Sequence, residues 1–167
     1  LRALEPGDVP VLSGELFADP AVMAFMFGGQ PLASAAAAAF IERHFAAASE
    51  SLGLGVLCEQ ETGRVIGFAG ILSTECLGAD DLEFGFALAR EAWGKGYAKE
   101  MGRRQIACAF EELNAARLLA LVHPHNTVSL RVIEGLGLTQ VKTVDICGRG
   151  PRRVFCIDRG DYMAVRH

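Results

Sequence analysis

The sequence predicts an α/β fold with a mixed β-sheet, and three observations lead to this class. Segments with the two-residue alternation or short apolar runs of strands recur along the chain, separated by segments with the three- and four-residue spacing of helices. The composition, 51% hydrophobic and 22% charged, is that of a globular protein with a substantial core. No linker or repeat interrupts the 167 residues, which favours one domain over residues 1–167.

The N-terminal part of the chain is expected to open with a short strand at residues 1–4 and to continue in helices. Asp8 is a candidate cap for a helix that runs to about residue 18. A second helix begins at Asp19 and ends at Gly28. The large apolar residues before Gly28 are predicted to be core residues rather than the wall of a pocket: Phe25, Met26 and Phe27.

A third, Ala-rich helix is expected from Ser34 to about residue 49. Its inward side chains are predicted to be Phe40, Ile41 and Phe45, and its solvated ones Glu42, Arg43 and His44.

Seven strands are predicted in all. Two of them flank the turn at residues 61–63 as a hairpin, and the last two flank residues 148–151 in the same way. The strands are residues 1–4, 53–59, 64–72, 82–89, 117–122, 138–147 and 152–157. After its first residue the strand 117–122 is fully apolar, as expected for a buried central strand.

A glycine-rich turn at residues 93–97 joins the strand 82–89 to a helix at 98–113. The helix is predicted to turn Ala98, Gly102, Ile106, Ala109 and Leu113 inward and Lys99, Glu100, Arg103 and Arg104 outward. Free N–H groups and the positive end of a helix dipole would meet at this turn, which suits a phosphate or pyrophosphate. Neither the Walker pattern nor the dinucleotide fingerprint fits, and a merely tight connection is the alternative.

The strand 117–122 leads into a second helix start, at Asn126. Asn126 is either a helix cap or a ligand-binding residue. This strand should neighbour the strand 82–89, because sequential strands usually lie side by side in a sheet. Two strands that each lead into a helix at the same end would form a cleft with converging hydrogen-bond donors, which favours a ligand site.

These segments together resemble the GNAT superfamily of acetyl-CoA-dependent N-acetyltransferases, most of all the branch of the ribosomal-protein-alanine N-acetyltransferases. The matching segments follow the family's order and are residues 19–23, 62–70, 82–86 and 93–98, with Asn126, Ser129 and Gly137. The resemblance implies a single domain, α/β (α+β), with a central mixed, mostly antiparallel sheet of about seven strands, helices on both faces and a V-shaped acyl-CoA cleft.

The resemblance also implies the residues of the site. Acetyl-CoA would be bound by Phe86, Ala87, Leu88, Trp93, Gly94, Lys95, Gly96, Tyr97, Ala98, Asn126 and Arg131. Glu83 would be the general base and Ser129 the proton donor. On the residues alone, Glu83 is equally a solvated or salt-bridged strand residue, Ser129 a helix hydroxyl, and Trp93 a core residue. Lys95 and Arg131 are more simply read as surface cations.

Three positions depart from the family pattern. Glu91 stands where Gln or Arg usually opens the acyl-CoA motif, and Leu138 replaces a usual Phe. Ile133 occupies the position of a frequent Tyr general acid, which leaves Ser129 as the proposed substitute.

The expected function is transfer of an acetyl group from acetyl-CoA to a primary amine, on a protein N-terminus or a small molecule, in a ternary complex. A catalytically silent acyl-CoA-binding sensor and a nucleotide-binding fold are the alternatives. The net charge of −4 argues against nucleic acid as a partner, and the apolar runs are too short for a membrane span. Five scattered cysteines without a paired motif predict no metal site, and free thiols predict a cytoplasmic location. The sequence leaves the oligomeric state open between monomer and homodimer.

Overall fold

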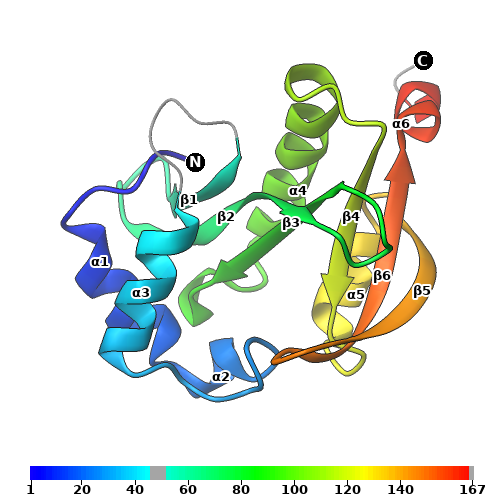
Figure 1. Cartoon of the computed structure of the whole chain (residues 1–167). Coiled ribbons are helices and arrows are strands. Elements are labelled where there is room, and N and C mark those ends of the chain that lie inside the picture. The colour runs from blue at the N-terminus through cyan, green and yellow to red at the C-terminus, as the bar shows by residue number, and fades with distance from the viewer. Residues whose placement is uncertain (46–51, 166–167) are drawn as a thin grey trace. The chain divides into compact units, whose positions relative to one another are not determined.

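The computed structural model describes residues 1–45 and 52–165 (Figure 1). In this part of the chain six strands form one sheet in the order β1-β2-β3-β4-β6-β5. The strands are β1 (Gly53–Cys58), β2 (Val65–Thr74), β3 (Asp81–Leu88), β4 (Arg117–Val122), β5 (Thr139–Ile146) and β6 (Gly150–Asp158). The predicted α/β class with a mixed sheet is confirmed. The chain divides into two compact units, Leu1–Gly70 with Phe86–Tyr97, and Ile71–Gly85 with Ala98–His167.

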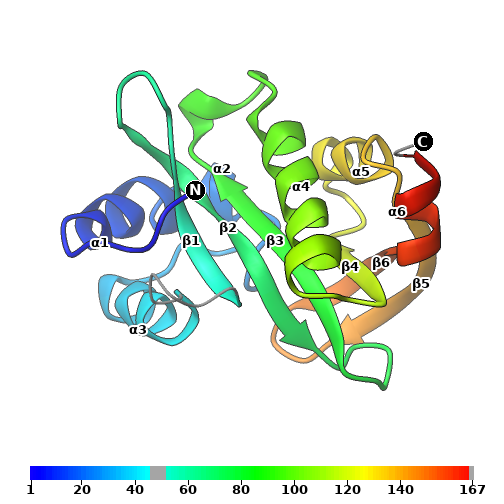
Figure 2. The same ribbon diagram turned by 90° about the horizontal axis from the view of Figure 1, so that it is seen from above.

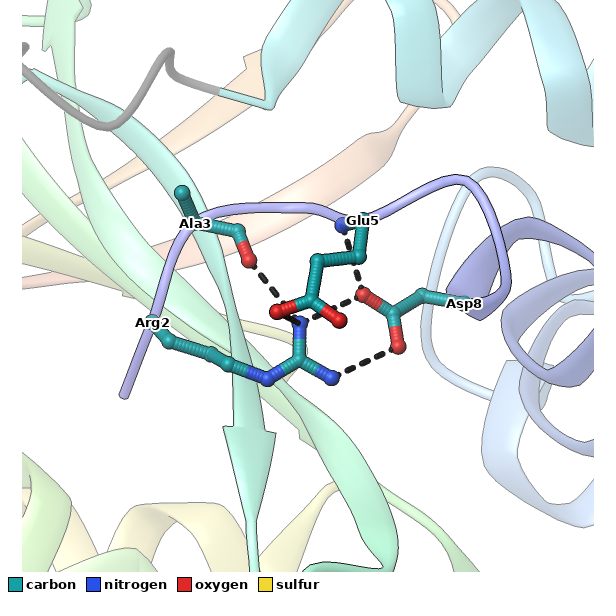
Figure 3. Close-up of polar contacts among 4 residues, drawn as sticks. All are labelled: Arg2, Ala3, Glu5 and Asp8. Atoms are coloured by element: carbon teal, nitrogen blue, oxygen red, sulfur yellow. Dashed lines mark hydrogen bonds and ion pairs between the residues drawn. The ribbon is translucent and has the colours of Figure 1, made fainter.

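The predicted first strand is wrong, which accounts for six strands in place of seven. Only Arg2 pairs with a strand, through an isolated antiparallel bridge to Val56. The Arg2 side chain turns to Asp8 and donates through both terminal nitrogens, at 2.6 and 2.8 Å (Figure 3). Asp8 also accepts the main-chain N–H of Glu5 at 2.8 Å, so the chain folds back over a few residues instead of extending.

Asp8 is therefore an ion-pair partner and not the predicted helix cap. The first helix, α1 (Asp8–Val11), has Gly7 at its N-cap, and it continues as the π-helix η1 (Leu12–Phe17). The Asp8 carboxylate is buried, and its hydrogen bond with Arg2 is the main reason that its pKa is lowered.

Replacing Asp8 by Asn should lower the free energy of unfolding by about 1–2 kcal/mol at pH 7, because the buried ion pair is lost while the amide oxygen can still accept a hydrogen bond. A lowered pKa gives stabilisation that is complete above the unfolded pKa near 3.9 and is lost as the pH falls through the folded value. Urea unfolding should therefore show the difference between the wild type and D8N shrinking in acid. The control is Glu5→Gln, since Glu5 is exposed and lies 3.6 Å from Arg2; an equal loss in E5Q would contradict the assignment.

The first unit also contains two further helices, both shorter than predicted. The helix α2 (Pro20–Met23) is capped by the Asp19 carboxylate, which accepts the Ala21 N–H at 2.8 Å. The helix α3 (Ser34–His44) ends because Phe45 is extended and bridges to Leu54. The predicted continuation over residues 46–49 lies outside the described residues.

Aromatic rings gather between these helices and β2. Phe17 is fully buried and lies 5.3 Å from Phe40, 5.4 Å from Phe68 and 6.5 Å from Phe27, between ring centroids. The predicted core residues Phe25, Met26 and Phe27 are in fact only half-buried. Of the predicted inward residues of α3, Ile41 is buried, while Phe40 and Phe45 are half-buried.

His44 is not solvated as predicted. It is half-buried and packs against Phe40 with the rings tilted by 39°, at 4.6 Å between ring centroids, and burial lowers its pKa. The other two residues predicted to be solvated, Glu42 and Arg43, are exposed.

The second unit carries the parallel pair of strands. β4 lies parallel to β3, with Leu82 opposite Leu118 and Glu83 opposite Leu119. β4 pairs antiparallel with β6, and β6 with β5, which gives the terminal hairpin visible in Figure 2. The predicted bounds of the strand at 117–122 are confirmed.

Four helical segments complete this part of the chain: α4 (Tyr97–Ala107), the π-helix η3 (Cys108–Glu112), α5 (Thr127–Glu134) and α6 (Arg159–Val165). The charged outer face predicted for α4 is confirmed, because Lys99, Glu100, Arg103 and Arg104 are all exposed. The sequence did not predict α6. It is fixed by Arg159, which donates to the carbonyls of Phe110 and Ala115, and by Tyr162, whose ring stacks on Phe110 at 4.8 Å.

Candidate functional site

The glycine turn, residues 94–98, leads into the N-terminus of α4. Gly94 and Gly96 have φ angles of +74° and +89°, a left-handed conformation that suits glycine. A Cβ atom at either position would meet no atom within 4 Å, so the space above the turn is open. Within the described residues, the N–H groups of Gly94, Lys95 and Gly96 have no hydrogen-bond acceptor. Alternating left-handed glycines with free amides form an anion-binding concavity.

The segment before the glycine turn is held by Trp93. Its indole N–H donates to the carbonyl of Leu88 at 2.8 Å, and its main-chain N–H donates to Arg90, the first residue of the 3₁₀ helix η2 (Arg90–Ala92). The Trp93 residue is 48% exposed, so the alternative of a core role is wrong. Arg90 in turn makes a bidentate ion pair with Asp19, at 2.9–3.1 Å.

Tyr97 anchors the other end of the glycine turn. Its hydroxyl donates to Glu59 at 2.7 Å, and Thr62 donates to the same carboxylate at 2.8 Å. The bond from Tyr97 is the main cause of the lowered pKa of Glu59, and the positive charge of Lys95 adds to it. Lys95 is exposed.

The predicted cofactor edge of β3 consists of Phe86, which is half-buried, and Ala87 and Leu88, which are buried. The Leu88 carbonyl already accepts the indole of Trp93. Gly67 lies against this edge so closely that a Cβ there would stand 2.1 Å from the Ala87 oxygen, whereas Gly85 faces open space. A residue without a side chain is therefore required at Gly67.

Glu83 is 9% exposed, so the solvated alternative for this carboxylate is wrong. Its Oε1 lies 3.4 Å from Nη1 of Arg149, in the turn of the β5–β6 hairpin. Arg152, on the same hairpin, is 3% exposed. Burial and the positive charge of Arg149 lower the pKa of Arg152, while the charges of Asp145 and Glu83 act in the opposite direction.

Neither arginine was predicted as a site residue. Their positions carry no local motif, and they come close to Glu83 only because the hairpin folds back.

At the start of α5, the Asn126 side chain accepts the N–H of Ser129 at 3.1 Å, so Asn126 is the helix cap. Ser129 is half-buried, and its hydroxyl has no hydrogen-bond partner in the part of the chain that the structure describes. Arg131 is exposed. Ile133 is 2% exposed, so the position at which the family often has a Tyr serves here for packing.

Residues 1–45 and 52–165 contain neither a cluster of metal ligands nor a membrane-spanning helix. No group of three or more His, Cys, Asp or Glu residues there could hold a metal ion. No helix in the same ranges has both the length and the hydropathy to cross a bilayer. Burial raises the pKa of the Cys156 thiol to about 11, which keeps this thiol protonated at neutral pH.

Comparison with protein families matches residues 1–139 to the acetyltransferase (GNAT) domain. The uncharacterized protein YkkB of Bacillus subtilis is 31% identical over 86% of this chain and 83% of its own length. The FsC-acetyl coenzyme A-N(2)-transacetylase of Aspergillus fumigatus is 32% identical over 75% of this chain, and the match spans 56% of that protein.

Solved structures share the fold. A GNAT-family acetyltransferase from Bacillus anthracis has a TM-score of 0.76 at 20% identity, over 94% of this chain and 92% of its own. Aminoglycoside acetyltransferase AAC(6')-Ib in complex with ribostamycin and coenzyme A has a TM-score of 0.77 at 18% identity, over 99% of this chain and 96% of its own. Spermidine N-acetyltransferase from Vibrio cholerae in complex with CoA and spermine has a TM-score of 0.76 at 20% identity, over 97% of this chain and 96% of its own.

Proposed function

The chain belongs to the GNAT family of N-acetyltransferases, and on this premise we propose that residues 1–167 are one acetyltransferase domain that transfers an acetyl group from acetyl-CoA to a primary amine. The observation that carries the cofactor assignment is the glycine turn, with open space above Gly94 and Gly96, where the N–H groups of residues 94–96 find no acceptor among the described residues. A diphosphate supplies the negative charge that such a turn at a helix N-terminus prefers.

In this proposal the amides of residues 94–98 bind the diphosphate, and Lys95 and Arg131, both exposed, contact phosphate oxygens. The pantetheine arm pairs with the main chain of residues 86–88 and contacts Asn126. The Leu88 carbonyl accepts the indole N–H of Trp93, and its second lone pair leaves it able to accept one further hydrogen bond from the cofactor.

Glu83 is proposed to remove the proton from the attacking amine, directly or through one water. A base is needed because an aliphatic amine has a pKa of about 10 and is mostly protonated at neutral pH. A main-chain N–H near Gly85 or Phe86 would stabilise the oxyanion. The leaving thiolate, with a pKa of about 8.5, needs little help, and Ser129 is the proposed proton donor.

Trp93 offers a direct test of the cofactor assignment, because it is the one tryptophan of the sequence and precedes the glycine turn. Adding CoA should change the indole emission in a saturable way. The variant Trp93→Phe should lose this signal while still binding CoA in isothermal titration calorimetry. CoA binding by calorimetry with no change in the emission of Trp93 would contradict a cofactor next to this indole.

The transfer itself is tested by incubating the protein with acetyl-CoA and a panel of amines and reading the product mass. Amines and peptides with free N-termini both belong in the panel, because solved relatives are named for small-molecule amines such as spermidine and aminoglycosides. Release of CoA that depends on the amine supports the proposal. Tight CoA binding without any acetylated product would favour the silent sensor, for which the buried Ile133 in place of Tyr is the argument.

A further inference from the structure

The guanidinium of Arg149 is only partly used within the protein. Its contact with Glu83 is a single hydrogen bond of 3.4 Å, and in residues 1–45 and 52–165 its side chain has no other hydrogen-bond or ion-pair partner. The side chain is 37% exposed. A guanidinium carries five N–H donors in a planar fork, so several of them remain available to a ligand.

Arg117, in the same unit, forms a bidentate ion pair and can be compared with Arg149. It binds Asp81 through two parallel hydrogen bonds, from Nε at 2.6 Å and from Nη2 at 2.7 Å. This is the bidentate geometry in which a guanidinium binds a carboxylate most strongly. Arg149 lacks such a partner, although it stands beside a buried carboxylate.

The acceptor amine must come close to Arg149 if Glu83 is the base. A direct hydrogen bond to either oxygen of Glu83 keeps the amine nitrogen within about 8 Å of the guanidinium. A carboxylate separated from that nitrogen by about one to three carbon atoms could therefore reach Arg149.

The charge around Glu83 also limits the acceptor. Two arginines, Arg149 and the buried Arg152, face one buried carboxylate. The second carboxylate that acts on Arg152, Asp145, is exposed and therefore screened by water. A polycation would bring further positive charge next to Arg149, which costs free energy, whereas an acidic group would pair with its guanidinium.

We propose that Arg149 is a specificity-determining residue that binds a carboxylate of the acceptor, so that the preferred acceptor is a small amine carrying a carboxylate and polycations are poor substrates. The inference rests on the proposed acetyl transfer with Glu83 as the base.

The test measures kcat and KM of the full chain with acetyl-CoA, by product mass, for matched amines that differ in the carboxylate. 4-Aminobutanoate is compared with butylamine, and spermidine and 2-aminoethyl phosphate are added as a polycation and a phosphate. The wild type should prefer 4-aminobutanoate over butylamine by roughly 10- to 100-fold in kcat/KM. Arg149→Gln should bring the ratio close to one, mainly through KM, and Arg149→Lys should keep part of the preference. Arg153→Gln, a half-buried arginine of β6, is the control and should behave as the wild type.

Each contrary outcome has a distinct meaning. Three outcomes would overturn the role of Arg149 and leave the acetyltransferase function standing. They are equal transfer to both matched amines, a preference for spermidine or for 2-aminoethyl phosphate, and an unchanged ratio in R149Q. Absence of transfer to every amine and peptide, with CoA still bound, would overturn both. Thermal unfolding shows whether R149Q is folded. If it is not, the kcat/KM ratio of 4-aminobutanoate to butylamine in R149K tests the role of Arg149 instead.

Discussion

Replacing Glu83 by Gln should lower kcat by roughly 100- to 10,000-fold at pH 7, while the affinity for CoA stays close to that of the wild type. Gln has the same shape and can still accept the hydrogen bond from Arg149 at its amide oxygen, but it cannot take a proton from the amine. Stopped assays with acetyl-CoA and a saturating amine give kcat, and calorimetry gives the affinity for CoA.

Asp80→Asn is the matched control for E83Q, because Asp80 is an exposed carboxylate a few residues earlier in the chain. It should leave kcat unchanged. Equal turnover in E83Q and the wild type would exclude Glu83 as the base and leave it as a salt-bridge partner of Arg149. A loss of CoA binding in E83Q would instead indicate a structural role.

Replacing Gly96 by Ala should weaken CoA binding by roughly 10- to 100-fold, since hydrogen bonds to a charged group contribute about 1.5–3 kcal/mol. Two effects combine. The φ of +89° is unfavourable for Ala, and the new Cβ would occupy the open space above the turn. No protein atom lies within 4 Å of the new methyl group, so the steric conflict is with the bound diphosphate, while the φ penalty lowers the stability of the protein.

Gly78→Ala is the control for G96A. Gly78 has a φ of +79° and also faces open space, but it lies in the loop between β2 and β3. Both variants should lose similar stability in thermal unfolding, and only G96A should lose affinity for CoA. An equal affinity in G96A and G78A would exclude the glycine turn as the diphosphate site.

Local signals predicted the elements that surround the candidate site. The strand predicted at 117–122 from its apolar residues is β4 with its observed bounds, and the turn at 148–151 predicted the β5–β6 hairpin. Asn126 was weighed as cap or ligand, and the cap geometry is present. The glycines 94 and 96 marked the turn, because left-handed φ angles favour glycine. Each of these signals is contained within a few neighbouring residues.

The sequence was less successful where the outcome depends on distant partners. Residues 1–4 have strand-like composition, yet the ion pair between Arg2 and Asp8 turns the chain away. The helix α6 depends on acceptors at Phe110 and Ala115, which precede it by more than forty residues. Trp93 was equally compatible with a core role, and only its exposure excluded that role.

The sequence by itself determined the family, the α/β class and the glycine turn, because periodicity, turn residues and motif order are properties of short segments. Only the tertiary structure decided the environment of Glu83, which pairs with a residue 66 positions away. The physical reason is that the charge and burial around a carboxylate are set by whichever segments the fold brings next to it, and no local pattern in a strand specifies them.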